Sequence, residues 1–244
     1  MALSASIQIS DQDIYQASSV ANSELIGQVA STSDGRAFRY TKNGAAELAA
    51  GKITEPVAST ANYVNRALTG YTAAQYTKQI TVVLGTTATA DQFIGQWLVV
   101  NDATGEGQGA YYITGNTAAT AGNSNTTTIS IKDGLRTALI ATSEISITPN
   151  QGSAVVIHSA AVAIPTSGAP VMVVPAAYYF WNQVAGMASI LSDGVIAKNT
   201  EGIPSDATAG SVETRVDASI VKAVGFAPEA TVTTEYMPFI LTLV

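Results

Sequence analysis

The only histidine of the chain, His158, is the first residue to consider for acid–base chemistry. It lies in the segment VVIHSAAV, among apolar neighbours. A histidine that acts as a general base needs a carboxylate or hydroxyl partner, and most neighbours of His158 in the sequence are apolar. We therefore expect a structural or solvent-facing role for His158. A lone histidine also excludes a multi-histidine metal site, so any metal would need oxygen ligands.

Acidic residues are the next candidates, because paired carboxylates can bind Ca²⁺ or act as the acid and base of a glycosidase. Asp11 and Asp13 flank Gln12, and four further carboxylates recur in the middle of the chain: Asp91, Asp102, Glu106 and Asp133. No EF-hand spacing is present. We expect these groups to be solvated turn residues, and we predict no catalytic, cofactor-binding or metal-binding residues.

The segment GEGQG, residues 105–109, superficially resembles a glycine-rich phosphate loop. A phosphate-binding loop needs a strand before it and a helix after it, whose N-terminus holds the phosphate. Here the strand-like sequence AYYITG follows, so the pattern predicts a hairpin turn. Asn125 opens an NTT glycosylation sequon, which matters only if the chain is secreted.

Composition narrows the classes of function. Charged residues make up 12% of the chain, about half the share usual for a soluble domain, so the surface must consist mainly of small and uncharged polar residues. Such a surface favours assembly with other subunits and is less typical of an enzyme that works as a free monomer. The net charge of −7, without a Lys/Arg cluster, argues against nucleic-acid binding. The absence of cysteine excludes thiol chemistry and fits a reducing cytoplasm.

Neither a signal peptide nor a membrane segment is expected. The sequence MALSASIQISDQDIYQ lacks a basic start and a continuous apolar core. The longest apolar runs are shorter than the roughly 20 residues that a membrane helix needs, and proline interrupts APVMVVPAAYYFW. We expect a soluble protein.

The order of strand-like and turn-like segments predicts a mainly β protein with a discontinuous architecture. We expect an extended N-terminal arm over residues 1–30. Residues 31–75 and 151–244 together form a discontinuous β-barrel or sandwich-like domain, and residues 76–150 form a small inserted β subdomain. In the arm, Ile7 and Ile9 alternate with polar residues, which indicates a short strand that adds to a neighbouring subunit's sheet or stays disordered.

Local turn chemistry supports this organisation. The pair Asn43-Gly44 is typical of a type I′ hairpin turn, because both positions must tolerate positive φ. Residues 79–149 hold five β-branched runs separated by Gly, Asn and Asp, and the polar stretch 115–128 predicts an exposed hairpin tip. Phe38 lies six residues before Gly44, and Phe180 lies six residues before Gly186. This equal spacing suggests one β unit used twice, with the subdomain inserted between the copies.

The aromatic segment AYYFWNQVAGMASILSDGVIAKN, residues 177–199, predicts a strand with two apolar faces. Alternation places Phe180 and Ile190 on one face, and Tyr179, Trp181 and Met187 on the other. We expect one face to fill the core and the other to be covered by another subunit or by the inserted subdomain. A sugar-binding platform is the alternative. The interface candidates are Ile7, Ile9, Ile14, Tyr15, Tyr179, Trp181 and Met187.

The C-terminal pattern resembles a known family. The segments YYFWNQVAGMASILSDGVIAKN, SDATAGSV, IVKAVGFAPEA and PFILTLV are similar to the small β domains of tailed-bacteriophage capsid decoration, or cement, proteins. The segments TSDGRAFRYTKNGAAELAAGKI and LVVNDATGEGQGAYYI likewise resemble parts of phage virion structural proteins. The inserted subdomain makes the chain larger than the simplest decoration proteins.

The resemblance implies a non-enzymatic protein without cofactors that is assembled in the host cytoplasm and located on the virion. It would bind the outer capsid surface as a homotrimer and stabilise the head, with the major capsid protein and further copies of itself as partners. Two other classes stay open. One is a host- or carbohydrate-binding head or tail fibre protein that uses Trp97, Trp181 and tyrosines as platforms. The other is an enzyme that uses Asp/Glu pairs.

Overall fold

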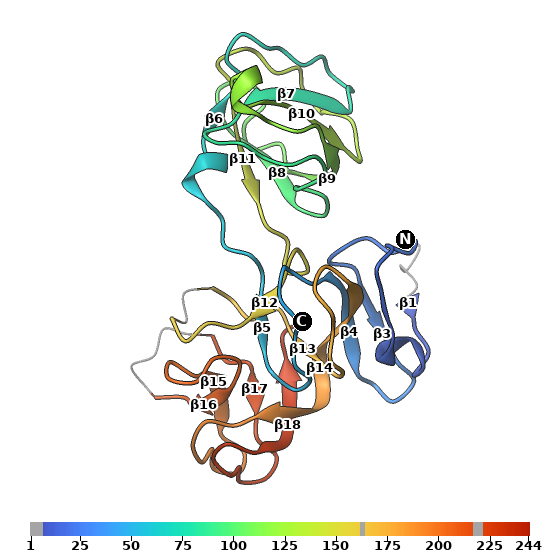
Figure 1. Cartoon of the computed structure of the whole chain (residues 1–244), viewed down its shortest axis with the longest axis vertical. Coiled ribbons are helices and arrows are strands. Elements are labelled where there is room, and N and C mark those ends of the chain that lie inside the picture. Colours follow the sequence, from blue (N-terminus) through green and yellow to red (C-terminus); the bar gives the residue numbers. More distant parts are fainter. Residues whose placement is uncertain (1–6, 162–163, 217–221) are drawn as a thin grey trace. The chain divides into compact units, whose positions relative to one another are not determined.

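The computed structural model describes residues 7–161, 164–216 and 222–244. The protein is mainly β, as the sequence predicted, and the helical elements are the single 3₁₀ turns η1 (Asp13–Tyr15), η2 (Ala61–Tyr63) and η3 (Ala121–Asn123) in this part of the chain. The chain forms two compact units (Figure 1). The discontinuous unit comprises Met1–Val57 and Gln151–Val244, and the inserted unit comprises Ala58–Asn150.

The inserted unit begins at residue 58, whereas the composition of the sequence placed its start at residue 76. Residues 58–75 belong to it because they supply apolar side chains to its core, among them Leu68 and Ala73. They also supply strand β6 (Arg66–Ala67), which pairs with β11 (Glu144–Thr148) at the other end of the unit.

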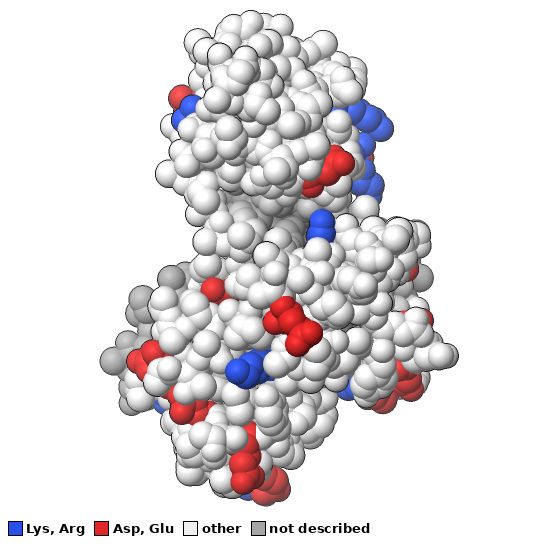
Figure 2. Space-filling model, in the orientation of Figure 1, with Lys and Arg blue, Asp and Glu red and all other residues white. Residues whose placement is uncertain are grey.

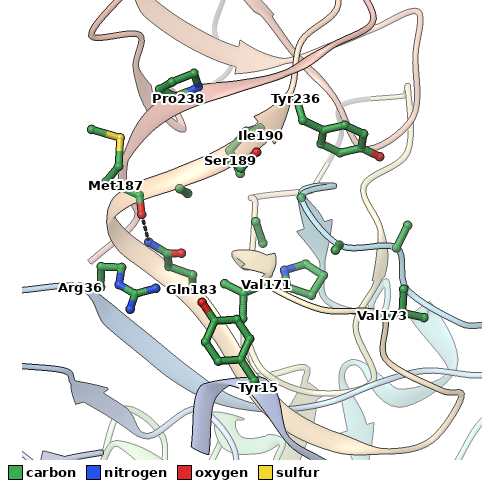
Figure 3. A pocket seen from close by; sticks show the side chains of 16 residues that line it. Tyr15, Arg36, Val171, Val173, Gln183, Met187, Ser189, Ile190, Tyr236 and Pro238 are labelled. Carbon is green, nitrogen blue, oxygen red and sulfur yellow. Dashed lines mark hydrogen bonds between the residues drawn. The ribbon is translucent and has the colours of Figure 1, made fainter. Parts of the chain in front are cut away.

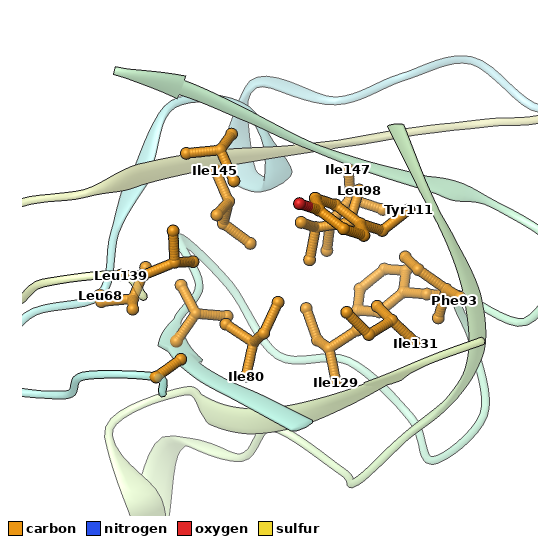
Figure 4. Packing of buried hydrophobic residues seen from close by; sticks show 14 of the residues in the cluster. Leu68, Ile80, Phe93, Leu98, Tyr111, Ile129, Ile131, Leu139, Ile145 and Ile147 are labelled. Atoms are coloured by element: carbon orange, nitrogen blue, oxygen red, sulfur yellow. The ribbon is translucent and has the colours of Figure 1, made fainter. Parts of the chain in front are cut away.

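Six strands of the inserted unit form one nearly closed, barrel-like sheet in the order β6-β11-β8-β9-β10-β7. The two edge strands approach each other where Arg66 Nε donates a hydrogen bond to the carbonyl oxygen of Val83, 3.3 Å away. Alternate side chains of the strands point inward, as in the pattern Thr-Thr-Thr-Ile-Ser-Ile of β10, and Ile80, Leu98 and Ile129 meet in the interior (Figure 4). The remaining strands are β7 (Gln79–Val83), β8 (Trp97–Asp102), β9 (Ala110–Asn116) and β10 (Thr126–Ile131).

Both hairpin predictions for this unit are confirmed. β8 and β9 pair antiparallel, so the GEGQG segment lies in the connection of a hairpin and a strand follows it. β9 and β10 also pair antiparallel, and the polar stretch between them contains η3. The five β-branched runs of the sequence correspond to β7 to β11.

The discontinuous unit contains a ten-stranded sheet whose main path is β1-β3-β4-β14-β18-β17-β15-β16, with β2 and β13 also paired to β14. A separate two-stranded ribbon joins β5 (Thr54–Glu55) and β12 (Val156–Ile157). The sheet strands are β1 (Ile7–Gln8), β2 (Ala17–Ser18), β3 (Val29–Ser31), β4 (Ala37–Lys42), β13 (Ala169–Pro170), β14 (Tyr179–Leu191), β15 (Glu201–Pro204), β16 (Val212–Thr214), β17 (Gly225–Phe226) and β18 (Tyr236–Thr242).

The predicted aromatic strand is confirmed as β14, the strand with the most partners in the sheet. Its first half is covered on both faces: Trp181 packs in a cluster with Ile14 and Tyr40, and Phe180 packs in another with Leu48. The covering residues belong to the same unit of the same chain. The expectation that another subunit or the inserted unit covers the face with Trp181 was therefore wrong.

The expected N-terminal arm is, from residue 7 onward, part of the chain's own sheet. β1 pairs in parallel with β3, with Ile7 opposite Ala30. β2 pairs with β14, and Ile14 between β1 and β2 is buried in the core. Both expectations for this segment, addition to a neighbouring subunit and disorder, are thus corrected for the described residues; residues 1–6 lie outside them.

The Asn43-Gly44 pair does not form the predicted type I′ turn, because neither residue has positive φ. Asn43 is buried, and its side-chain nitrogen donates to the carbonyl oxygens of Ala46, Val174 and Pro175. The side chain thus ties the backbone at Ala46 to that at Val174 and Pro175. The suggested repeat is not reflected in the backbone at this point. Gly186, the counterpart of Gly44, lies inside β14 with a φ of 86°, whereas the φ of Gly44 is not positive.

The inserted unit enters at the open end of the β5–β12 ribbon, where Val57 N donates to the carbonyl oxygen of Ser153. Replacing residues 58–150 with a short Gly/Ser loop should therefore leave the discontinuous unit folded, because the cores of the two units share no residue. We expect its free energy of unfolding to change by no more than about 1 kcal/mol. Urea unfolding followed by the fluorescence of Trp181 would measure this; a chain without a cooperative transition would contradict it.

Candidate functional site

A groove of about 950 Å³ with a mainly apolar lining lies on the discontinuous unit. Its sixteen lining residues come from η1, β13, β14, β18, the segment 49–51, Arg36 just before β4, and Val171 and Val173 just after β13 (Figure 3). We call it the apolar groove. Its lining consists of Tyr15, Arg36, Ala49, Ala50, Gly51, Ala169, Pro170, Val171, Val173, Gln183, Met187, Ala188, Ser189, Ile190, Tyr236 and Pro238.

Four large side chains of the groove are about half exposed. The exposed fractions are 57% for Tyr15, 51% for Met187, 50% for Val173 and 49% for Tyr236. A single exposed hydrophobic residue is ordinary, whereas a contiguous apolar patch marks an interaction surface. These four residues come from four separate segments of the chain, so the fold itself gathers them.

The groove borders an edge of β14 that no strand covers. β14 pairs with β18 along one edge from Ala185 to Leu191, and with β4 along the other edge only as far as Ala185. Beyond that point, Leu191 N donates to the carbonyl oxygen of Gly51. Because alternate residues of a strand point their backbone groups to the same edge, Met187 and Ser189 face this edge too. No strand of the described chain pairs with them there.

The buried side chain of Gln183 partly substitutes for the missing strand. Its Nε2 donates to the carbonyl oxygen of Met187, at 2.8 Å (Figure 3), and to that of Ala185, at 3.2 Å. The side chain reaches toward the C-terminal part of its own strand, past a bulge between Gln183 and Ala185 where the pairing with β4 ends. An extended peptide could pair with such an edge while its side chains enter the apolar groove.

Arg36 is the charged residue of the groove lining, and it is already engaged. Its Nε donates to Asp34 Oδ2 at 2.7 Å, and its Nη2 lies 3.7 Å from Asp11 Oδ1. Burial alone would lower the pKa of Arg36, but hydrogen bonds to Asp34 and Tyr15 outweigh it and raise the pKa. Charged side chains are also sparse on the face of the molecule in Figure 2. The groove therefore offers shape and apolar surface rather than an unpaired charge.

The structure divides the predicted interface residues. Tyr15 and Met187, which the sequence did not place together, both line the groove. Ile14 and Trp181 are buried within their own chain, and they are core residues. Ile7 is partly exposed on β1, away from the groove lining, and Ile9 and Tyr179 pack against the cluster of Trp181. The prediction missed Val173 and Tyr236, whose valine-rich and polar surroundings gave no sign of a shared surface.

His158 is buried, so the solvent-facing alternative was wrong. The fold brings a carboxyl group from a distant part of the sequence to it: its Nδ1 lies 3.5 Å from Oε2 of the buried Glu55. The β5–β12 pairing brings them together, since Glu55 lies opposite Val156 and Thr54 opposite Ile157. With the ring enclosed, the pair has no described access for a substrate.

The structure also bears on the candidate metal ligands, on Trp97 and on membrane-spanning helices. Within the described ranges, no three His, Cys, Asp or Glu side chains are grouped so that they could hold a metal ion. Trp97 packs edge-on against Tyr112, with ring centroids 5.4 Å apart. No helix in this part of the chain is long and apolar enough to span a membrane.

Comparisons with known proteins identify no relative: no family model, no curated protein and no solved structure matches the chain. The function is therefore argued from the apolar groove, from the open edge beside it and from the sequence pattern described above.

Proposed function

We propose that this protein is a non-enzymatic virion structural protein that binds the outer capsid surface of a tailed phage and stabilises its head. The observation that carries the proposal is the apolar groove beside the open edge of β14. The low content of charged residues and the resemblance of the C-terminal segments to decoration proteins support it. The partners are the major capsid protein and further copies of this chain in a homotrimer.

The groove would hold an extended, largely apolar segment of the major capsid protein. Backbone groups of that segment would pair with Met187 and Ser189 as an added strand, and its side chains would pack against Val173 and Tyr236. Burial of apolar surface contributes about 25 cal/mol per Å² before the cost of ordering. A trimer would engage three such segments at once, so modest single contacts would add up to firm attachment.

The carbohydrate-binding alternative is less well supported. A sugar platform needs an aromatic ring with an accessible face, and Trp181 is only 4% exposed. Trp97 has an edge-on contact with Tyr112. These positions favour structural roles for both tryptophans.

Met187→Asp should weaken binding to capsids at least about 30-fold, because it places a charge in the apolar centre of the contact. Co-sedimentation of the purified protein with capsids of the source phage that lack it would measure the effect. Val195→Asp is the matched control: Val195 belongs to the same unit, is 64% exposed and does not line the groove. We expect the control to bind within about twofold of the original chain.

Two outcomes would contradict the proposal. If the original chain does not co-sediment with capsids, the assigned role is wrong. If Met187→Asp and Val195→Asp bind equally well, the groove is not the contact surface. Light scattering tests the homotrimer separately, since a monomer at working concentration would exclude it.

A further inference from the structure

A second, smaller cavity lies on the discontinuous unit, where the N-terminal segment crosses β4 and β14. Its volume is about 220 Å³, below the about 300–1,000 Å³ typical of sites for drug-sized ligands. It has the size of a single side chain or a small head group. We call it the aromatic pocket, and it is lined by Ile9, Asp13, Gln16, Ala17, Ser18, Asn22, Glu24, Tyr40, Tyr179, Phe180 and Trp181.

One wall of the aromatic pocket is a row of rings from two paired strands. Trp181 on β14 lies opposite Tyr40 on β4, and Tyr179 lies opposite Lys42. The centroid of the Tyr40 ring is 5.3 Å from that of Trp181 and 6.0 Å from that of Tyr179. Lys42 Nζ lies 5.4 Å from the centroid of Tyr179. The ammonium group of Lys42 thus makes a cation–π contact with the ring of Tyr179, whose negative face attracts it.

The lining of the aromatic pocket also contains the carboxyl groups of Asp13 and Glu24 and no cationic residue. Ser10 Oγ donates to Asp13 Oδ2 at 2.8 Å. Glu24 Oε2, in contrast, is buried and accepts no hydrogen bond from the described residues. A buried acceptor without a donor costs about 1–3 kcal/mol, and more when it is charged.

The pKa of Tyr40 is raised by burial, and the charge of Glu24 contributes to this shift. Burial raises the pKa of Tyr40, the hydrogen bond that its hydroxyl accepts from Asn22 N lowers it, and the nearby negative charge of Glu24 raises it further. A cation in the pocket would pair with the carboxylate of Glu24.

We propose that the aromatic pocket binds a cationic head group, a guanidinium or a primary ammonium, with Glu24 as the acceptor and Tyr40 and Tyr179 as the aromatic wall. The cation belongs either to a small molecule or to an arginine or lysine side chain of a partner protein. A sugar fits less well, because the rings of Tyr40 and Tyr179 stack on each other with an interplanar angle of 13°. This site is separate from the apolar groove, with which it shares no lining residue.

Trp181 provides a fluorescent probe in the pocket wall once the second tryptophan is removed by Trp97→Phe. The full chain with this substitution is titrated with n-butylguanidinium, n-butylammonium and the neutral N-butylurea. We expect a saturable change of Trp181 fluorescence with the cations, at a Kd of about 1 mM, and none with N-butylurea. Glu24→Gln should weaken cation binding at least about tenfold. Glu47→Gln, at an exposed site of the same unit outside the pocket, should leave it unchanged.

A capped pentapeptide with one arginine, compared with the same peptide carrying citrulline, distinguishes the two sources of the cation. Tighter binding of the arginine peptide than of n-butylguanidinium supports a partner side chain, and weaker or equal binding supports a small molecule. The proposal is overturned if neither cation gives a saturable response, if N-butylurea binds as well as n-butylguanidinium, or if Glu24→Gln binds the cations unchanged. Failure of the capsid experiment would leave this result unaffected.

Discussion

Replacing His158 with alanine is expected to lower the free energy of unfolding of the discontinuous unit by about 3–5 kcal/mol, because it opens a cavity at a buried ring and removes the polar group beside the buried Glu55. The ring nitrogens of His158 lie 2.9 Å from the carbonyl oxygen of Ser159 and 3.0 Å from that of Ile164. Its Nδ1 also lies 3.5 Å from Oε2 of Glu55.

Glu55 depends on this ring more than an exposed carboxylate would. Its Oε2 is buried and accepts no hydrogen bond from the residues that the structure describes. Without His158 the buried carboxyl group of Glu55 would keep its desolvation cost and lose this polar neighbour. Urea unfolding followed by Trp181 fluorescence in a Trp97→Phe background would measure the loss, since Trp181 lies in this unit and Trp97 in the other.

A double-mutant cycle separates the pair from the cavity that alanine creates at position 158. His158→Ala and Glu55→Gln are combined, and we expect the double variant to be more stable than the sum of the single losses by about 1–3 kcal/mol. Strictly additive losses would show that the two side chains do not interact. A loss below about 1 kcal/mol for His158→Ala would show that Glu55 does not need the imidazole.

The sequence predicted those parts of the fold that local patterns determine. The β-branched runs of the inserted unit became strands β7 to β11, and the glycine-rich and polar stretches between them became hairpin connections. β14 was found from its aromatic alternation. In each case the period of apolar residues and the adjacent turn residues agree, so neighbours along the chain are enough to define the element.

The pairing of strands and side chains that are distant in the sequence could not be predicted from local patterns. The partner of β1 is β3 of the same chain, and a short alternating segment does not specify which edge it joins. Glu55 and His158 are separated in sequence by the whole inserted unit, and only the β5–β12 register brings them together. Asn43 was misread because the pattern Asn-Gly indicates a turn preference, whereas its three hydrogen bonds to the carbonyl oxygens of Ala46, Val174 and Pro175 arise from the tertiary structure.

The candidate sites depend on where strands end, which the sequence pattern did not reveal. The apolar groove exists because β4 stops pairing at Ala185 and Gln183 satisfies the carbonyl groups beyond it. The aromatic pocket exists because the N-terminal segment brings Asp13 and Glu24 to a row of rings on β4 and β14. Tyr15 was an interface candidate as part of the expected arm, and Met187 as part of the covered face of the aromatic strand; only the fold brings the two residues together.

Gly225→Ala is expected to lower the free energy of unfolding of the same unit by at least about 3 kcal/mol, because β17 and β18 approach too closely there for a side chain. A Cβ at this position would overlap the carbonyl oxygen of Ile240 and lie 2.9 Å from Cε1 of the buried Phe239. Gly225 pairs directly with Leu241, so relief of the overlap requires the two strands to separate. β15 and β16 continue the sheet from β17 and would move with it.

Gly194→Ala distinguishes this overlap from ordinary backbone strain. Gly194 lies in the same unit with a φ of 93°, and a Cβ there would meet no atom within 4 Å. Alanine should therefore cost only the strain of a left-handed conformation, about 1 kcal/mol. Both losses are measured by urea unfolding with Trp181 as the reporter. A Gly225→Ala loss no larger than that of Gly194→Ala would mean that β17 can move from β18 without cost, and that the sheet is not continuous through this pair.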